Sequence, residues 1–187
     1  QEAKGRPVME FGARRAQGYD SATYGARAAY IGGVAGTATV SAGEMFDIPV
    51  VGTMAHSFVQ SFDSEYEAFK AYALTYPDDC VLLVDTYDTL KSGVPHAIEI
   101  AKEVLEPMGK KLKGIRLDSG DISYLSKRAR AMLDVAGLTY VSISASNSLD
   151  EYLIRSLLNQ GAQLDSFGVG ERLITSKTEP VFGGVYK

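Results

Sequence analysis

Apolar and polar positions follow one another along this chain in blocks that predict parallel strands joined by helices. A wholly apolar run of strand length, Cys80 to Val84, ends directly in the polar segment Asp85 to Asp88. From Val84 onward the order strand, polar turn and helix occurs three times, at a spacing of roughly 25–30 residues that is typical of right-handed crossover connections. These strands alternate little between apolar and polar residues, which predicts that both faces of the sheet are covered.

Helices are indicated by apolar residues at helical spacing and by residues that favour helix ends. Ser64 with Glu67, and Ser148 with Glu151, have the spacing of capping boxes, and Pro95 stands where a helix begins. We therefore expect helices over 22–31, 64–76, 95–106, 122–136 and 148–160. We expect strands over 34–40, 50–54, 80–84, 114–118 and 140–144 and a last strand ending at 167–170, about six in all.

The fold class predicted by this pattern is α/β with a parallel sheet. The pattern fits either most of a β/α barrel or a doubly wound sheet, because periodicity alone does not distinguish the two. No linker, low-complexity tract or block of like charge divides the sequence, so we expect a single domain over residues 1–187.

Composition excludes several classes of function. The net charge is −4 and no basic stripe is present, which argues against a nucleic-acid partner. The longest wholly apolar strand-like run is far too short to span a bilayer, so no membrane partner is expected. One cysteine cannot form an internal disulfide, which favours a reducing, cytoplasmic location. The sequence starts at Gln1 without an initiator Met, and we expect a fragment.

Polar residues stand at the carboxyl end of each predicted strand. In parallel α/β folds this is the edge at which ligands bind. Carboxylates there can bind ribose hydroxyls or Mg²⁺, glycines leave backbone N–H groups available for phosphate, and an arginine fits an anion. The sequence therefore predicts a phosphorylated sugar and an anionic partner. The strand ends carry His56 and Ser57, Asp85 and Asp88, Arg116, Asp118 and Asp121, Ser146 and Asn147, and Gly168 and Gly170.

Six motifs in order along the chain resemble the nicotinate phosphoribosyltransferase family. They are Glu10 to Ala16 (EFGARRA), Gly52 to Ser57 (GTMAHS), Val84 to Asp88 (VDTYD), Ile115 to Asp121 (IRLDSGD), Ala145 to Asn147 with Leu149 to Glu151, and Phe167 to Gly170 (FGVG). The resemblance implies an enzyme that joins nicotinate to phosphoribosyl pyrophosphate, giving nicotinate mononucleotide and pyrophosphate. It also implies the irregular, parallel β/α barrel-like fold of the type II phosphoribosyltransferases, here incomplete, and a homodimer whose site is completed across the interface.

The resemblance also implies roles for individual residues. Phe11 would lie against the pyridine ring, with Arg14 near it, and Arg116 is a candidate for the nicotinate carboxylate. Asp85 and Asp118 would bind ribose hydroxyls or the sugar pyrophosphate with its Mg²⁺, whose protein ligands stay unknown. Gly168 and Gly170 would receive the 5′-phosphate, and Ser57 and Asn147 would contact substrate.

His56 stands in the segment whose histidine is phosphorylated by ATP in this family, which couples ATP hydrolysis to substrate binding and product release. A neutral imidazole nitrogen is a competent phosphoryl acceptor. The structural alternative is a hydrogen-bonded histidine at the end of a strand. Other polar residues also have purely structural explanations. Asp88 and Asp121 can be helix caps, Asn147 a turn residue, Arg15 and Arg172 surface cations, and His96 a solvated surface residue.

Two features bear on the choice of substrate and on activity. The related nicotinamide enzyme places an aspartate in the segment that matches Val34 to Val40, and this segment has no carboxylate here, which favours nicotinate. Quinolinate enzymes rely on a more basic pocket. Glu171 follows the Gly168 to Gly170 turn, where a small hydroxyl residue is usual, so a catalytically silent nucleotide-binding fragment is the remaining alternative.

Overall fold

A computed structural model of the protein describes residues 1–177, and these residues form two compact units. The first unit consists of residues 1–52, 147–153 and the chain from Phe167 onward. The second unit consists of residues 53–146 and 154–166. The predicted α/β class is confirmed in both, because each unit combines helices with parallel strands. Whether residues 1–187 act as a single domain stays a prediction.

Three parallel strands form the sheet of the first unit in the order β2, β1, β6. Strand β1 is Val8–Glu10, β2 is Gly36–Thr37, and β6 is Ser166–Val169, whose first residue belongs to the second unit. Met9 of β1 lies opposite Gly36 of β2 and Gly168 of β6. The helices of this unit are the 3-10 helix η1 (Ala13–Arg15), α1 (Tyr19–Ile31), α2 (Val40–Phe46) and α8 (Glu171–Ile174).

The second unit contains the parallel strands β3 (Val81–Leu83), β4 (Gly114–Leu117) and β5 (Ser142–Ala145) in the order β3, β4, β5. Leu82, Ile115 and Ile143 are in register across them. The helices are α3 (His56–Gln60), α4 (Glu65–Thr75), α6 (Ile122–Val135) and a continuous helical run of η2 (Thr89–Gly93), α5 (Val94–Ile100), η3 (Ala101–Leu105) and η4 (Glu106–Met108). Helix α7 (Glu151–Asn159) starts in the first unit and ends in the second.

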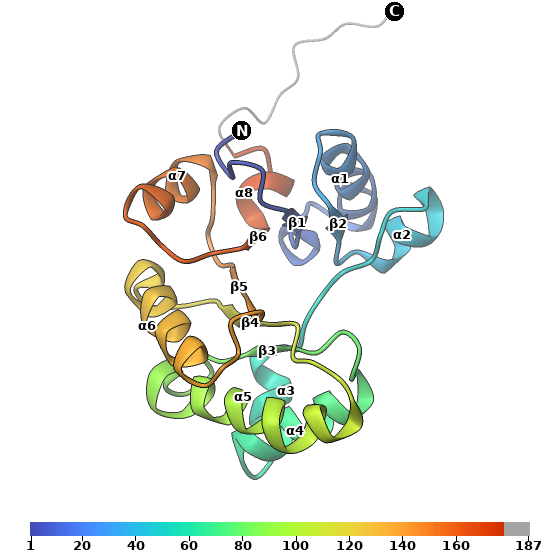
Figure 1. Ribbon diagram of the computed structural model, residues 1–187. Coiled ribbons are helices and arrows are strands. Elements are labelled where there is room, and N and C mark those ends of the chain that lie inside the picture. Colours follow the sequence, from blue (N-terminus) through green and yellow to red (C-terminus); the bar gives the residue numbers. More distant parts are fainter. Residues whose placement is uncertain (178–187) are drawn as a thin grey trace, which may run out of the picture. The chain divides into compact units, whose positions relative to one another are not determined.

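A continuous apolar core holds the strands and helices of the second unit together. Figure 1 shows α4, α5 and α6 flanking the strands β3 and β4 of this unit. The fully buried side chains include Phe69 of α4, Leu82 and Leu83 of β3, Leu105 of η3, Ile115 and Leu117 of β4, Leu133 of α6 and Ile143 of β5. Cys80 is also buried, as expected for a small apolar residue, and burial raises the pKa of its thiol to about 12.

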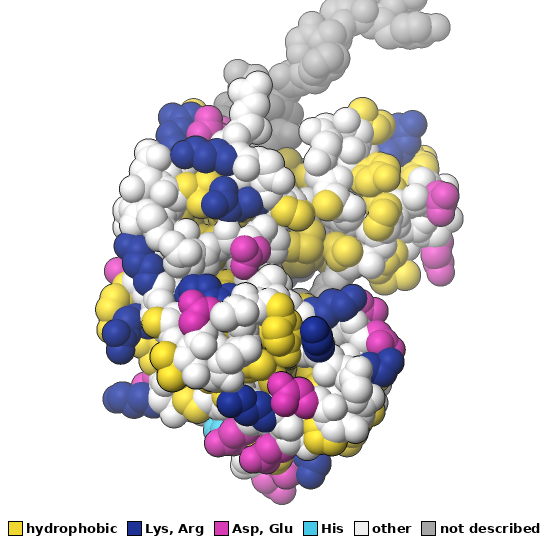
Figure 2. Space-filling view, viewed as in Figure 1, with side chains coloured by type: hydrophobic (Ala, Val, Ile, Leu, Met, Phe, Trp, Pro, Cys, Tyr) yellow, Lys and Arg dark blue, Asp and Glu magenta, His cyan; other side chains and the backbone are white. Residues whose placement is uncertain are grey.

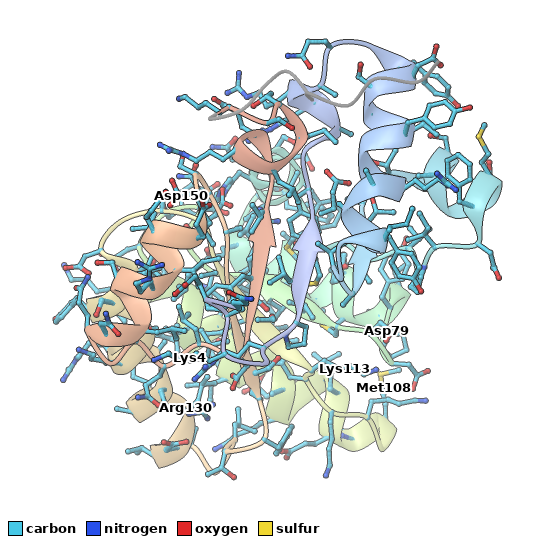
Figure 3. The ribbon with its side chains drawn as sticks, turned by 90° about the horizontal axis from the view of Figure 1, so that it is seen from above. Lys4, Asp79, Met108, Lys113, Arg130 and Asp150 are labelled. Carbon is cyan, nitrogen blue, oxygen red and sulfur yellow. The ribbon has the colours of Figure 1, made fainter. Side chains whose placement is uncertain are left out.

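Ion pairs at the amino ends of β3 and β4 join the two strands outside the core. The Lys113 ammonium lies 2.8 Å from the Asp79 carboxylate, and Lys110 lies 2.6 Å from Asp78. Figure 3 shows Lys113 and Asp79 side by side. These pairs are exposed, so they contribute little to stability.

The first unit has a smaller core and a more apolar surface. Ala26 of α1, Ala42 of α2 and Ile48 pack together with Phe46. Figure 2 shows hydrophobic side chains gathered over α1 and α2, and the exposed ones of this region include Tyr24, Tyr30, Ile31, Val40 and Met45. No helix among residues 1–177 is long and apolar enough to cross a membrane.

Most predicted helices are confirmed, but the region before His56 differs from the prediction. The strand expected over 34–40 is reduced to β2, and residues 40–46 form helix α2. The strand expected over 50–54 is reduced to a single parallel bridge between Val50 and Thr37. Gly43 allows this arrangement, because a Cβ there would lie 2.3 Å from a methyl group of Val50. This close packing is a tertiary feature that periodicity does not detect.

Strand β5 alternates between buried and partly exposed residues, contrary to the expectation of little alternation. Ile143 and Ala145 are buried, whereas Ser142 and Ser144 are partly exposed. The hydroxyl of Ser144 lies 2.7 Å from that of Ser166, and Ser142 donates to the carbonyl of Lys113. One face of β5 is therefore polar.

Candidate active site

The polar residues that follow β3, β4 and β5 meet in the second unit. Asp85 lies just after β3, Asp118 directly follows β4, and Ser146 directly follows β5. Because the three strands are parallel and adjacent, their carboxyl ends lie at one edge of the sheet. His56 reaches the same place from the start of helix α3, and Arg116 reaches it from β4. The sequence-based prediction that His56, Asp85, Asp118 and Arg116 converge is therefore confirmed in geometry.

Arg116 is held in place by three side chains of the second unit. Its Nε donates to Ser146 Oγ, its Nη1 to Thr53 Oγ1 and its Nη2 to Asp118 Oδ1, each at 2.8 Å. Ser146 also donates to Asp118 Oδ1. Hydrogen bonds at three points fix the guanidinium plane, so an anion bound by Arg116 meets a preorganised partner.

Asp85 is a buried carboxylate with one satisfied and one unsatisfied oxygen. Its Oδ2 accepts from the backbone N–H of Asp118 at 2.8 Å and from the hydroxyl of Ser119 at 2.6 Å. Its Oδ1 is buried and has no hydrogen-bond partner among the described residues. A buried carboxylate oxygen without a donor is unfavourable. Asp85 Oδ1 is therefore the atom of this site best placed to accept a hydrogen bond from a ligand or to bind a cation.

His56 lies with its two ring nitrogens in different environments. Its Nε2 is 3.4 Å from Asp118 Oδ2 and 3.9 Å from Asp85 Oδ1, and its Nδ1 is 3.1 Å from Thr86 Oγ1. Two carboxylates beside Nε2 favour the tautomer that carries its proton there, which leaves a lone pair on Nδ1. His56 was expected at a strand end, but it begins helix α3, because residues 50–54 form no strand.

Asp118 has opposing influences on its acidity. Burial alone would raise the pKa of this carboxyl group, but the hydroxyl of Ser146, the charge and hydrogen bond of Arg116 and the contact with His56 outweigh burial and hold the pKa below its usual value. Asp118 is therefore ionised at neutral pH and presents a negative charge beside His56.

A second set of predicted residues lies in the first unit. Phe11 is half-buried between β1 and η1, and Arg14 of η1 is exposed. Gly168 is buried within β6, and Gly170 follows it. A Cβ on Gly170 would lie 3.0 Å from the carbonyl oxygen of Phe11, so the missing side chain lets the ends of β1 and β6 approach closely.

The other candidates fall into two groups. Ser57, the second residue of α3, is exposed. Asn147 occupies a turn with φ of 76°, which confirms its turn conformation. The contact of these two residues with substrate stays a prediction. Asp88 accepts from the backbone N–H groups of Leu90 and Lys91, and Asp121 accepts from Tyr124, so both are helix caps.

One surface expectation changes, and two agree with the structure. His96 is paired with the buried Glu65 at 3.0 Å instead of being solvated. Arg15 and Arg172 are exposed, as expected for surface cations. Arg15 lies 3.6 Å from Glu171, and Arg172 lies 2.7 Å from Asp150.

The cap of α7 differs from the predicted box of Ser148 with Glu151. Asp150 Oδ1 accepts from the backbone N–H of Leu153 at 2.7 Å. Ser148 instead has φ of 54° and donates to Asn147 Oδ1.

Hydroxyl groups that support the charged residues were not assigned this role from sequence. They are Thr53, Thr86, Ser119 and Ser146, and each lies within a motif that carries the family resemblance. Their position in the same motifs as the charged residues is the feature of the sequence that could have predicted this supporting role. The buried Glu10 of β1 was also missed.

The site does not form a complete metal centre from protein ligands. The described residues contain no group of three or more histidine, cysteine, aspartate or glutamate side chains that could hold a metal ion. The unsatisfied Asp85 Oδ1 nevertheless suits Mg²⁺ that is bound mainly through substrate phosphates, which is how proteins commonly hold this ion.

Comparison with known proteins gives consistent matches. Residues 7–182 match the model of the nicotinate phosphoribosyltransferase (NAPRTase) family. The chain is 55% identical over 180 residues to the nicotinate phosphoribosyltransferase of Bacillus subtilis, covering 96% of this chain and 36% of that protein. It is 40% identical over 229 residues to the enzyme of that name from Dictyostelium discoideum, covering 98% of this chain and 39% of that protein.

Solved structures agree with these matches. The structure of nicotinate-nucleotide pyrophosphorylase from Pyrococcus furiosus has a TM-score of 0.78 and 32% identity, covering 94% of this chain and 44% of that chain. Human nicotinic acid phosphoribosyltransferase has a TM-score of 0.73 and 30% identity, and the match covers 90% of this chain and 44% of that chain. These matches confirm the predicted barrel-like parallel β/α fold class. The chain spans less than half the length of these relatives.

Proposed function

Because this chain belongs to the nicotinate phosphoribosyltransferase family, we propose that it forms part of the catalytic machinery that joins nicotinate to phosphoribosyl pyrophosphate. The products would be nicotinate mononucleotide and pyrophosphate. The observation that carries the proposal is the meeting of His56, Asp85 and Asp118 in the second unit, with Arg116 held beside Asp118.

The carboxylates of Asp85 and Asp118 would stabilise the transition state. When the bond between the anomeric carbon and pyrophosphate breaks, positive charge develops on the ribose ring. A fixed negative charge beside the ring stabilises that state more than it stabilises the uncharged sugar. Asp85 Oδ1, which is buried without a partner, suits a ribose hydroxyl or Mg²⁺. Mg²⁺, when bound, would neutralise the leaving pyrophosphate.

Nicotinate would bind through its ring and its carboxylate. In this proposal Phe11 lies against the pyridine ring with Arg14 near it, Arg116 pairs with the nicotinate carboxylate, and Gly168 and Gly170 receive the 5′-phosphate, while Ser57 and Asn147 contact substrate. The absence of a carboxylate from residues 34–40 supports nicotinate over nicotinamide, because an acidic side chain there would repel the anion. Comparing turnover of the two substrates tests this point, and a preference for nicotinamide would contradict it.

We further propose that ATP phosphorylates His56 at Nδ1. With the proton held on Nε2 by Asp118, and with Asp85 nearby, the Nδ1 lone pair would attack the γ-phosphorus of ATP. The new N–P bond forms as the bond to the bridging oxygen breaks, and ADP leaves. A phosphorylated His56 that tightens substrate binding ~10-fold would represent a coupling of about 1.4 kcal/mol.

The experiment uses the two histidines of the chain as a matched pair. The full chain is incubated with γ-labelled ATP and Mg²⁺, and acid-labile phosphate is measured in the wild type, His56→Ala and His96→Ala. We expect label in the wild type and in His96→Ala and none in His56→Ala. Label that persists in His56→Ala would contradict the phosphohistidine. Pyrophosphate release from nicotinate and phosphoribosyl pyrophosphate, with and without ATP, tests the reaction separately.

We also propose a homodimer, as the family resemblance implies. Sedimentation velocity of the full chain tests this proposal, and a single species at the monomer mass across the micromolar range would contradict it.

A further inference from the structure

Glu10, at the carboxyl end of β1, is a fully buried carboxylate that the reaction described above does not use. Its exposed fraction is 0%. Its Oε1 accepts from the backbone N–H of Gly12, and its Oε2 accepts from the hydroxyls of Thr37 at 2.5 Å and Thr39 at 3.3 Å. One side chain therefore joins the segment after β1 to the segment after β2.

Backbone hydrogen bonds extend this connection to the residues between. Ala38 N–H donates to the carbonyl of Glu10 at 2.9 Å, and Thr39 N–H donates to Thr37 Oγ1 at 2.9 Å. Thr37 and Thr39 are buried, whereas Ala38 is exposed and Phe11 is half-buried. The buried residues thus form an anchor next to the half-buried Phe11 and the exposed Ala38.

Stability alone does not account for a carboxylate at this position. Removing a carboxylate from water is costly, and the described hydrogen-bond partners of Glu10 are a backbone amide and two hydroxyls, none of which carries a positive charge. An apolar side chain would avoid that cost. It could not, however, accept hydrogen bonds from both segments at once and so fix their separation.

We propose that Glu10 is a positioning residue for the pyridine site, because it fixes the distance between Phe11 and the Thr37–Thr39 segment. This inference rests on the proposed function, in which Phe11 lies against the pyridine ring. Carboxyl ends of parallel strands are the edge at which α/β enzymes bind ligands, and β1 and β2 are parallel neighbours. Loosening the anchor at Thr37 would widen one side of a site for a flat ring, while the hydrogen bond from Gly12, which packs against Gly170, stays in place.

The test weakens the hydrogen bonds of the anchor with substitutions of nearly the same shape, Thr37→Val and Glu10→Gln. Nicotinate and phosphoribosyl pyrophosphate affinities are measured by calorimetry on the full chain for the wild type, Thr37→Val, Glu10→Gln and Thr37→Ser. We expect Thr37→Val and Glu10→Gln to weaken nicotinate binding about 10-fold, which corresponds to a change of about 1.4 kcal/mol. Thr37→Val, which leaves the hydrogen bond from Gly12 to Glu10 in place, should weaken phosphoribosyl pyrophosphate binding less than about 2-fold. Thr37→Ser keeps the hydroxyl and should bind nicotinate as the wild type does.

Thr23→Val is the matched control in the same unit. Thr23 is 1% exposed, and its hydroxyl lies 3.1 Å from that of Ser41, so it joins α1 to α2 through a hydroxyl pair that does not include Glu10. It should lower the melting temperature by an amount similar to Thr37→Val without changing nicotinate affinity. A nicotinate affinity that stays the same in Thr37→Val and Glu10→Gln, or that falls equally in Thr23→Val, would overturn the inference.

A spectroscopic measurement keeps the test independent of activity and of folding defects. The Gly12 amide proton, bonded to a carboxylate, should resonate downfield and move upfield in Glu10→Gln. A wild type that fails to bind nicotinate contradicts the proposed function. A wild type that binds, combined with Thr37→Val binding equally well, contradicts only the role of Glu10.

Discussion

Asp118 shows how the chemistry of one side chain is set by neighbours that are distant in sequence. Ser146 and His56 lie 28 and 62 residues away from it, yet both contact its carboxylate, together with Arg116. Their combined effect holds the pKa of Asp118 below its ordinary value in spite of burial. The ionised Asp118 therefore stabilises the fold. This stabilisation is fully present above the pKa that Asp118 has in the unfolded chain, and it is lost as the pH falls through the lower pKa that Asp118 has in the folded protein.

Ser146→Ala tests this assignment. The substitution should raise the pKa of Asp118 toward its ordinary value, because the hydroxyl is the largest of the influences that lower it. It should also cost about 1–3 kcal/mol of unfolding free energy, because Arg116 Nε and Asp118 Oδ1 each lose a hydrogen bond. Carboxyl NMR titration measures the pKa, and urea unfolding at several pH values measures stability.

The control for this prediction is Ser142→Ala on β5, the strand that Ser146 directly follows. The Ser142 hydroxyl donates to the carbonyl of Lys113 and not to Asp118 or Arg116. It should leave the Asp118 titration unchanged. A pKa for Asp118 that does not move in Ser146→Ala would contradict the account of this network.

At the scale of single elements, helix ends follow local sequence closely. Ser64 accepts from the backbone N–H of Glu67, as the capping-box spacing predicts, and Asp88 and Asp121 cap the helical segments that follow them. Such contacts involve residues two or three positions apart, so local sequence can specify them. Asp121 therefore has a structural explanation even though it lies in the same motif as Arg116 and Asp118.

Asp121→Ala should lower the unfolding free energy by about 1 kcal/mol, because the first turn of α6 loses its side-chain cap. Asp121→Asn retains a capping oxygen and should be close to the wild type. Chemical unfolding measures both variants. If Asp121→Ala abolished nicotinate binding while its fold stayed intact, Asp121 would belong to the site.

Gly93 illustrates an element contact that local sequence does not reveal. A Cβ at this position would lie 1.8 Å from the carbonyl oxygen of Val84, the residue before Asp85. The helical run that starts with η2 can therefore pack directly against the end of β3 only if residue 93 has no side chain. This packing supports the backbone that presents Asp85.

Overpacking a well-packed core typically costs about 1–3 kcal/mol. Gly93→Ala should lower the unfolding free energy by about 3 kcal/mol or more, because the atoms that its Cβ would meet belong to the backbone. Gly52→Ala is the control, since a Cβ there meets no atom within 4 Å. Urea unfolding compares the two variants. Equal stability of Gly93→Ala and Gly52→Ala would contradict this packing.

At the scale of the whole molecule, the chain passes between its two compact units more than once. It leaves the first unit after Gly52, returns at Asn147, leaves again after Leu153 and returns at Phe167. Units that are interleaved in this way need no linker of distinct composition. For this reason the sequence showed no boundary, and each unit was recognised only from its contacts.

Charge is also a whole-molecule property, and it predicts weak interaction with nucleic acid. The net charge of −4 leaves no excess of cations to replace the counterions of DNA. Fluorescence anisotropy of a labelled DNA duplex at 0.1 M salt should show no binding at micromolar protein concentrations. Binding that is abolished by added salt would indicate a basic surface that the net charge conceals.

The sequence by itself determined the parallel α/β class, most helices, several caps and the residue types at the strand ends, because these depend on periodicity and on short-range hydrogen bonds. It failed over residues 34–54, where the structure has the short strand β2, helix α2 and a single bridge, and where Val50 packs closely against Gly43.

Only the tertiary structure decided which polar groups meet. Thr53 bonds to Arg116 across 63 residues, Glu10 to Thr37 across 27, and His96 to Glu65 across 31. No local pattern encodes such pairs, because they form only when the packing of strands and helices brings distant segments together. Composition supplied the chemical groups of this site, and the packing of strands and helices supplied their distances.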